Sequence, residues 1–105
     1  MLLCIGQNRR NELVNSTMSL RHLEAIYRLI RQPIAERLGE QSEWIVMNDI
    51  TLDSFDTVAL TELPEKEFNL ACQLILSNPN QDELIEPLIP ELKVLFKQDS
   101  RFQVT

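Results

Sequence analysis

The chain has 105 residues, 44% of them hydrophobic, with two cysteines and a formal net charge of −6. The length predicts a single domain, 1–105, with one hydrophobic core, and the hydrophobic fraction argues against wholesale disorder. The negative charge disfavours direct binding to a nucleic acid backbone. The cysteines do not indicate a secreted disulfide framework, which favours a cytoplasmic protein.

The composition favours helices over sheets. Only two glycines occur, Gly6 and Gly39, although sandwiches and barrels with many tight turns need more residues that tolerate positive φ. The apolar start at residues 1–5 reaches Arg9 too soon for a signal peptide, and no run approaches the roughly 18 apolar residues of a membrane span. The prediction is a mainly α chain, folded as a compact bundle of about four to six helices.

The first third contains one clear helix. Residues 1–18 are ambiguous, because their apolar start fits an edge strand or the start of a helix. A helix over residues 20–38 is predicted from apolar side chains that recur at three- and four-residue steps, namely Leu20, Leu23, Ile26, Ile30 and Ile34. Pro33 predicts a kink in this helix or a restart near residue 32, and Gly39 predicts its end.

The middle of the chain allows two interpretations. Residues 44–60 are rich in β-branched and aromatic side chains and fit a short β-hairpin, but Ser42 and Ser54 could each cap a short helix, which we favour. Residues 64–78 predict a helix with Pro64 in its first turn. A short turn and then a helix from about residue 90 to 97 complete the prediction.

The acidic residues are concentrated in the middle of the chain. Between Gly39 and Leu92 there are twelve carboxylates and a single cation, Lys66. Such a region usually forms a solvated face. Its breadth, with clusters in one loop and at two predicted helix starts, favours a surface that meets a cationic protein. We expect these carboxylates to converge in space and to mimic the phosphates of a nucleic acid.

No other pattern indicates catalysis or a cofactor site. His22 is the only histidine, and we interpret it as a solvated helix residue rather than a catalytic base. Cys72 lies on an apolar helical stripe and is interpreted as a core residue. The spacing of Asp49, Asp53 and Asp56 lacks the glycine and the terminal glutamate of a calcium loop. We therefore predict a protein that is not an enzyme and that has no cofactor or metal.

Three segments carry a family resemblance, namely residues 63–70, 86–92 and 99–102. Their acidic helix starts and closing segment are similar to those of small immunity proteins of bacterial toxin systems, the partners of colicin nucleases and of contact-dependent growth-inhibition toxins. The resemblance implies an antitoxin of bacterial competition that binds its cognate toxin domain one to one and neutralises it. The toxin would be a nuclease, because nucleases carry basic substrate clefts, and the inhibitor would plug the cleft or cover an adjacent exosite.

The predicted partner contacts are carboxylates around one aromatic anchor. The carboxylates of first choice are Asp49, Asp53, Asp56, Glu62, Glu65 and Glu67, and those of second choice are Asp82, Glu83 and Glu86. The anchor is Trp44 or Phe55, and a position in the core is an equally weighted alternative for each. Neither nucleic acid nor a membrane is an expected direct partner.

Two rival hypotheses come from other functional classes. The first is a non-catalytic adaptor or structural subunit of a larger assembly, which would use its amphipathic helices and expose an apolar patch. The second is a small enzyme or RNA-binding protein that would use His22 with the arginines of the first third. The helical pattern instead assigns these arginines to a solvent face: Arg9, Arg10, Arg21, Arg28, Arg31 and Arg37.

Overall fold

The computed structural model describes residues 1–103 and contains a small mixed sheet. Strand β1 (Leu2–Gln7) lies in the centre, antiparallel to β2 (Leu13–Thr17) and parallel to β3 (Thr57–Ala59). Along these strands the side chains alternate, so that Leu3, Ile5 and Val58 are fully buried while most side chains of the opposite face keep some exposure. The sheet therefore has one covered face and one open face.

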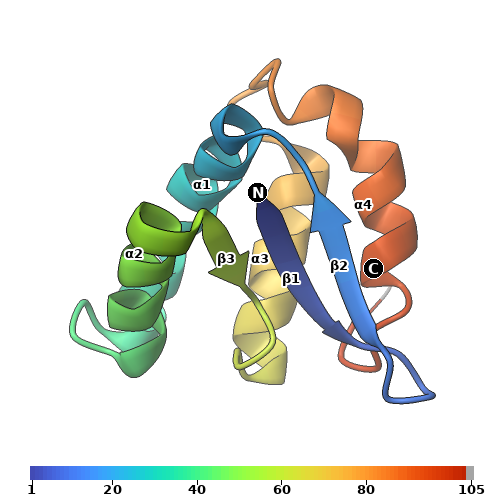
Figure 1. Cartoon of the computed structure of the whole chain (residues 1–105), viewed down its shortest axis with the longest axis horizontal. Coiled ribbons are helices and arrows are strands. Elements are labelled where there is room, and N and C mark those ends of the chain that lie inside the picture. The colour runs from blue at the N-terminus through green and yellow to red at the C-terminus, as the bar shows by residue number, and fades with distance from the viewer. Residues whose placement is uncertain (104–105) are drawn as a thin grey trace.

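The helices lie against the covered face and around the edges of the sheet. Figure 1 shows α1 and α3 behind the sheet, α2 beside β3 and α4 beyond β2. Their bounds are α1 (Leu20–Leu38), α2 (Glu43–Phe55), α3 (Glu65–Ser77) and α4 (Ile89–Phe96), and a short 3-10 helix, η1 (Glu86–Leu88), precedes α4. Within residues 1–103, no helix is both long and apolar enough to cross a lipid bilayer.

The first 18 residues form a hairpin rather than the start of a helix. Its turn is closed by Asn8, whose Oδ1 accepts hydrogen bonds from the backbone N–H groups of Arg10 at 2.8 Å and Glu12 at 3.0 Å. Asn11 adopts a left-handed conformation with φ of 60°, which asparagine tolerates better than most residues. This local turn chemistry settles the ambiguity in favour of a strand, but the strand is the central one of the sheet and not an edge strand, because β1 pairs on both sides.

Helix α1 continues through Pro33, so the predicted restart near residue 32 is wrong. An interior proline costs about 3 kcal/mol, but Ile26, Ile30 and Ile34 are fully buried on one side of the helix, before and after the proline. Burial of each such side chain contributes roughly 1.5–3 kcal/mol, which outweighs the cost. The helix ends at Gly39, as predicted, with φ of 100°.

The alternative hairpin at 44–60 is also wrong, and so is the second short helix capped by Ser54, because Ser54 lies inside α2 and Thr57–Ala59 form strand β3. Helix α2 starts at Ser42, whose side chain accepts from the N–H of Ile45 at 3.5 Å, and ends at Asp56 in a left-handed conformation with φ of 49°. The following strand β3 pairs with β1, far away in sequence, and not with residues 44–50. Packing of Trp44, Ile45 and Asn48 against the rest of the chain favours the helix over a local hairpin.

The prediction of a mainly α chain is confirmed, with a small β component. The predicted helices over 64–78 and 90–97 are present as α3 and α4. The helices do not assemble as a helical bundle, because the buried side chains of β1, β2 and β3 form a common core with them. A sheet that is apolar on one face needs helices to cover that face, and here α1 and α3 cover it while also packing against each other.

Helix α2 also covers the outer edge of β3. The Asn48 Oδ1 accepts from the N–H of Ala59 at 2.8 Å, and the Trp44 indole N–H donates to the carbonyl of Ala59 at 2.8 Å. A second bond, from the Asn48 side-chain amide to the carbonyl of Trp44 at 2.9 Å, fixes the orientation of the asparagine. Ala59 thus has both backbone groups satisfied by side chains of α2.

The C-terminal segment is fastened by Arg101. Its guanidinium donates to the carbonyls of Ile5 at 3.0 Å and Leu63 at 2.7 Å, and forms an ion pair with Asp99 at 2.9 Å. It also stacks over the Phe68 ring at 3.8 Å from the centroid. We call this arrangement the Arg101 clamp. Gly6 is required beside it, because a Cβ there would lie 1.7 Å from the Asp99 Oδ2.

Candidate protein-binding surface

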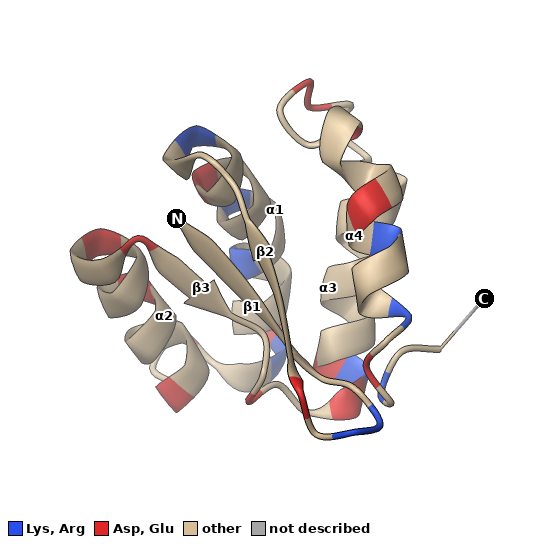
Figure 2. Ribbon diagram, turned by 45° about the vertical axis from the view of Figure 1, so that its right-hand side comes forward, with Lys and Arg blue, Asp and Glu red and all other residues tan. Residues whose placement is uncertain are grey.

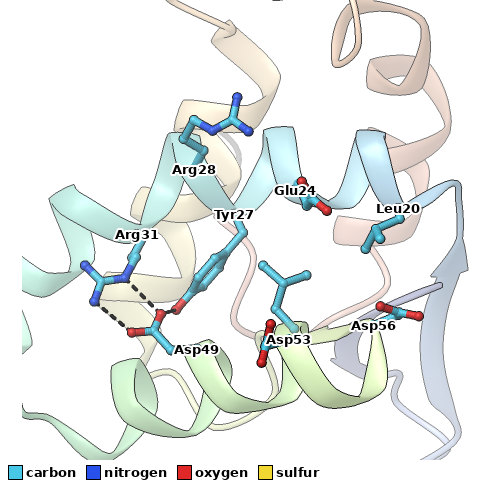
Figure 3. Close-up of a pocket in the computed structure, with 9 residues that line it drawn as sticks. Leu20, Glu24, Tyr27, Arg28, Arg31, Asp49, Asp53 and Asp56 are labelled. Atoms are coloured by element: carbon cyan, nitrogen blue, oxygen red, sulfur yellow. Dashed lines mark hydrogen bonds and ion pairs between the residues drawn. The ribbon is translucent and has the colours of Figure 1, made fainter.

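A groove between α1 and α2 gathers several predicted contact residues. It has a volume of about 480 Å³ and is lined by Leu20, Glu24, Tyr27, Arg28, Arg31, Asp49, Leu52, Asp53 and Asp56. Asp49 and Asp53 lie four residues apart on α2, so the helix places them on one side. Figure 3 shows Glu24 projecting from α1 above Asp53, with Asp56 beyond the end of α2. The groove therefore joins apolar side chains to a set of carboxylates.

Asp49 is engaged by its own chain. Its carboxylate accepts from the Arg31 Nε at 2.9 Å, from the Arg31 Nη2 at 2.8 Å and from the Tyr27 hydroxyl at 2.6 Å. Arg31 also pairs with Glu40 at 3.1 Å. The Arg31 hydrogen bonds hold the pKa of Asp49 below its ordinary value, against the effect of burial, while burial and the bond to Asp49 raise the pKa of Tyr27. Asp49 thus fastens α2 to α1, and its charge is compensated.

Glu24, Asp53 and Asp56 have uncompensated charges. Across residues 1–103, no arginine or lysine nitrogen lies within 4.0 Å of their carboxylates. The Arg28 side chain extends away from α2 and leaves the groove open (Figure 3). Leu20 and Leu52 provide apolar surface in the same groove. This combination suits a long cationic side chain, whose aliphatic part would contact the leucines and whose charged group would reach the carboxylates.

A second groove lies on the other side of α2, towards β3. It has a volume of about 400 Å³ and is lined by Glu43, Trp44, Met47, Asn48, Thr51, Ala59 and Glu62. Glu43 and Glu62 are exposed, and neither forms an ion pair among the described residues. Together with Asp53 and Asp56, they place uncompensated carboxylates on both sides of α2.

The two predicted aromatic anchors differ in position. Trp44 is only 7% exposed, its indole N–H is used by Ala59, and its ring lies 6.0 Å from that of Tyr27. Trp44 therefore takes the alternative role, that of a core residue, because its polar atom and most of its surface are already occupied. Phe55 is 71% exposed at the end of α2 and remains a candidate anchor.

The remaining predicted carboxylates do not join the α2 group. Glu65 accepts from the Gln103 side chain at 2.8 Å, and Glu67 pairs with Arg37 at 3.6 Å. At the other end of α3, Glu86 accepts from the Asn78 side chain at 2.9 Å and the Asp82 Oδ1 from the N–H of Leu84 at 2.9 Å. Glu83, next to Asp82, is exposed.

The expected convergence of all twelve carboxylates is therefore wrong. Figure 2 shows acidic residues on α2, at the start of α3 and in the loop before α4. Helix α3 has 13 residues and spans about 20 Å, so the clusters at its two ends are well separated. This separation could not be predicted from the sequence, because the distance between the acidic clusters depends on the direction in which α3 crosses the molecule.

The other candidate residues have structural surroundings. The His22 ring hydrogen-bonds through Nδ1 with the hydroxyl of Ser19, three residues earlier, and it is not among the residues that line the two grooves beside α2. Cys72 is buried, as predicted, and burial raises the pKa of its thiol to about 12. In the described part of the chain, no three His, Cys, Asp or Glu side chains form a group that could hold a metal ion.

The ion pairs predict a stability that falls in acid. Burial opposes ionisation of Asp99, but the Arg101 hydrogen bonds outweigh it and lower its pKa, as Arg31 does for Asp49. The unfolded chain therefore binds these protons first as the pH falls, so the stabilisation is complete above the ordinary carboxyl pKa of 3.8 and is lost as the pH falls through the lower folded value. Urea unfolding should show the midpoint decreasing over this range.

The variant Asp49→Asn distinguishes the contribution of Asp49 to this pH dependence from that of Asp99. Its difference in stability from the wild-type chain should be largest near neutral pH and should shrink as the medium becomes acidic, because the Asp49 carboxyl then loses its charge. Stability curves of variant and wild type that stay parallel down to about pH 3 would contradict a role of the Asp49 charge.

Comparison with known proteins yields no relative. No family model, curated protein or solved structure matches this chain. The resemblance to immunity proteins therefore stays a prediction from the sequence, and function must be argued from the surface of the chain itself.

Proposed function

We propose that this chain is a cytoplasmic immunity protein, a small inhibitor that binds a basic toxin domain one to one and neutralises it. One observation carries this proposal. Among residues 1–103, Glu24, Asp53 and Asp56 form no ion pair with a cationic side chain, and they surround an open groove that also exposes leucine side chains. A face built in this way fits arginine or lysine side chains of another protein.

The charges would act mainly on the rate of association. A negative surface attracts a basic domain over distances of about 8–10 Å at physiological salt and orients it before contact. The toxin would be a nuclease, because the cleft that binds nucleic acid is basic. Carboxylates on α2 would then occupy or screen positions that phosphates otherwise take. Asp53 and Asp56 are the principal contacts in this proposal, with Glu24, Glu43 and Glu62 around them.

A protection assay tests the function. The open reading frame directly upstream of this gene in the producing strain would be expressed in a laboratory bacterium, where a toxin should arrest growth. Co-expression of this chain should restore growth, and purified toxin and chain should form a one-to-one complex. An upstream product that arrests growth equally with and without the chain would contradict the proposal, as would an upstream product without toxicity.

Charge reversal on α2 should remove most of the protection. In the double variant Asp53→Lys and Asp56→Lys, we expect the association rate to fall by about tenfold or more at low salt, because the groove then repels a basic partner. Stopped-flow fluorescence at several salt concentrations measures this rate. The matched control is Glu83→Lys with Glu91→Lys, which makes the same change in net charge at exposed positions outside the groove. Equal rates for both double variants would contradict a contact through the groove.

A second candidate function is favoured by a different observation. Several apolar side chains on α2 are exposed, including Met47 at 49% and Ile50 at 50%, as expected for an adaptor subunit that packs permanently into a larger assembly. An adaptor would form a stable homo-oligomer when isolated or co-purify in constant proportion with the same large complex. An inhibitor would stay monomeric until its toxin is added, so sedimentation of the purified chain distinguishes the two.

A further inference from the structure

Helix α2 is apolar on two sides, although the fold uses only one. Trp44 and Ile45 face the core, but Val46, Met47 and Ile50 are 40%, 49% and 50% exposed, and Phe55 at the helix end is 71% exposed. A surface helix of a globular protein normally has one apolar stripe and a polar outer face. The outward apolar side chains of α2 contribute little to the core, so their role lies outside the folded chain.

Three of these side chains form a continuous strip. Val46 and Ile50 are four residues apart, and Met47 and Ile50 are three apart, which makes them neighbours on the helix surface. Phe55, at the C-terminal end of α2, is also exposed but projects from another side of the helix, because it lies five residues after Ile50. We call Val46, Met47 and Ile50 the outer strip. Such an arrangement along a single helix fits a partner helix laid against it.

Carboxylates border the outer strip on both sides. Asp49 and Asp53 form the adjacent row of α2 on the side of α1, while Glu43 and Glu62 lie with Met47 around the groove towards β3. Helix α2 contains no lysine or arginine. The outer strip is therefore an apolar surface that is flanked by carboxylates.

The carboxylates beside the outer strip determine which kind of partner can bind there. Two copies of the chain that met through α2 would bring together the carboxylates of Asp53, Glu43 and Glu62, which form no ion pair among the described residues, and this is repulsive. An anionic membrane would be repelled for the same reason. A positively charged amphipathic helix satisfies both parts of the surface, because its apolar side chains can cover the strip while its lysines and arginines reach the carboxylates.

We propose that the outer strip of α2 docks a cationic amphipathic helix of the partner protein. This inference rests on the proposed function, since it names the part of the toxin that the inhibitor would hold. Val46, Met47 and Ile50 would supply the apolar contact that slows dissociation, while Asp53 and Glu43 would pair with cationic side chains at its two borders. Steering by charge and retention by apolar contact are then separate properties of one helix.

A peptide titration tests the surface without the toxin. The probe is a synthetic helical peptide of about 18 residues, with leucine along one face and lysine on the other, added to isotope-labelled protein and followed by NMR. We expect saturable shifts centred on residues 43–55. A scrambled peptide of equal composition should bind about tenfold more weakly or less, because it lacks an apolar face. Equal binding of both peptides, or shifts centred elsewhere, would overturn the inference.

Matched variants complete the test. The triple variant Val46→Ser, Met47→Ser, Ile50→Ser should weaken peptide binding by about tenfold or more and should remain folded by circular dichroism, because the three side chains face solvent. Val94→Ser is the control, since Val94 is 61% exposed on another helix, α4. Unchanged affinity of the triple variant would overturn the inference, as would a wild-type dimer that the triple variant abolishes, or binding of wild type to anionic vesicles.

The protection assay separates this inference from the proposed function. If the triple variant protects cells from the toxin as well as wild type does, the docking surface is wrong while the function stands. If wild type gives no protection but binds the amphipathic peptide through α2, the function is wrong while the docking surface stands.

Discussion

Replacing Arg101 by alanine is expected to lower the free energy of unfolding by about 3–5 kcal/mol. The Arg101 clamp joins β1, the segment after β3 and α3 through one guanidinium. Without it, Asp99, whose side chain is 4% exposed, would stay buried as an unpaired carboxylate, and four backbone carbonyls would lose a donor. Urea denaturation followed by circular dichroism measures the change.

Two further variants show whether geometry or charge matters in the clamp. Arg101→Lys keeps the positive charge but cannot reach several carbonyls in one plane, so it should recover only part of the loss. Arg10→Ala is the control for removal of an arginine, because Arg10 is exposed at the hairpin turn, and we expect a change within about 0.5 kcal/mol. An Arg101→Ala protein within about 1 kcal/mol of wild type would contradict the clamp.

Trp44→Ala is expected to cost about 3–5 kcal/mol, whereas Phe55→Ala should change stability by no more than about 0.5 kcal/mol. Trp44 is buried against Tyr27, and its removal leaves a cavity and an Ala59 carbonyl without its donor. Phe55 is mostly exposed. Thermal and urea unfolding of the two variants measure this difference directly.

The same pair of variants should behave oppositely in binding. Phe55→Ala should weaken binding to the partner without loss of stability, as expected for an exposed anchor at the C-terminal end of α2. Trp44→Phe, which retains most of the packing and loses the N–H, should cost about 1–3 kcal/mol of stability and leave the affinity of the folded fraction unchanged. A Phe55→Ala variant that is strongly destabilised would contradict the assignment of the two aromatics.

The helices could be predicted because their signals are local. The apolar periods of α1 and α3 and the stop at Gly39 depend on residues within one or two turns. The sheet could not be predicted, because β1 pairs in parallel with β3, which is distant in sequence. The register of this pairing places Leu3 beside Val58. Neither strand alone shows which distant segment it pairs with or in which register. The three residues of β3 are also too few to show alternation.

The candidate site could be predicted only in part. Asp53 and Asp56 are three residues apart, so their proximity at the end of α2 is visible in the sequence. The ion pair that compensates the charge of Asp49 is not visible in the sequence, because its partner Arg31 lies 18 residues earlier on another helix. The contribution of Glu24 depends on how α1 packs against α2. The outer strip could not be predicted, because α2 has apolar residues on more than one side and its sequence alone does not show which side is buried.

The contact between α2 and Ala59 has a consequence for self-assembly. A strand at the border of a sheet normally offers free N–H and C=O groups, which can recruit a strand of another molecule and so begin a fibril. At Ala59 both groups are occupied by Trp44 and Asn48, so a foreign strand would first have to displace them. Loss of the Asn48 side chain would therefore free the N–H of Ala59 to pair with a strand of another molecule.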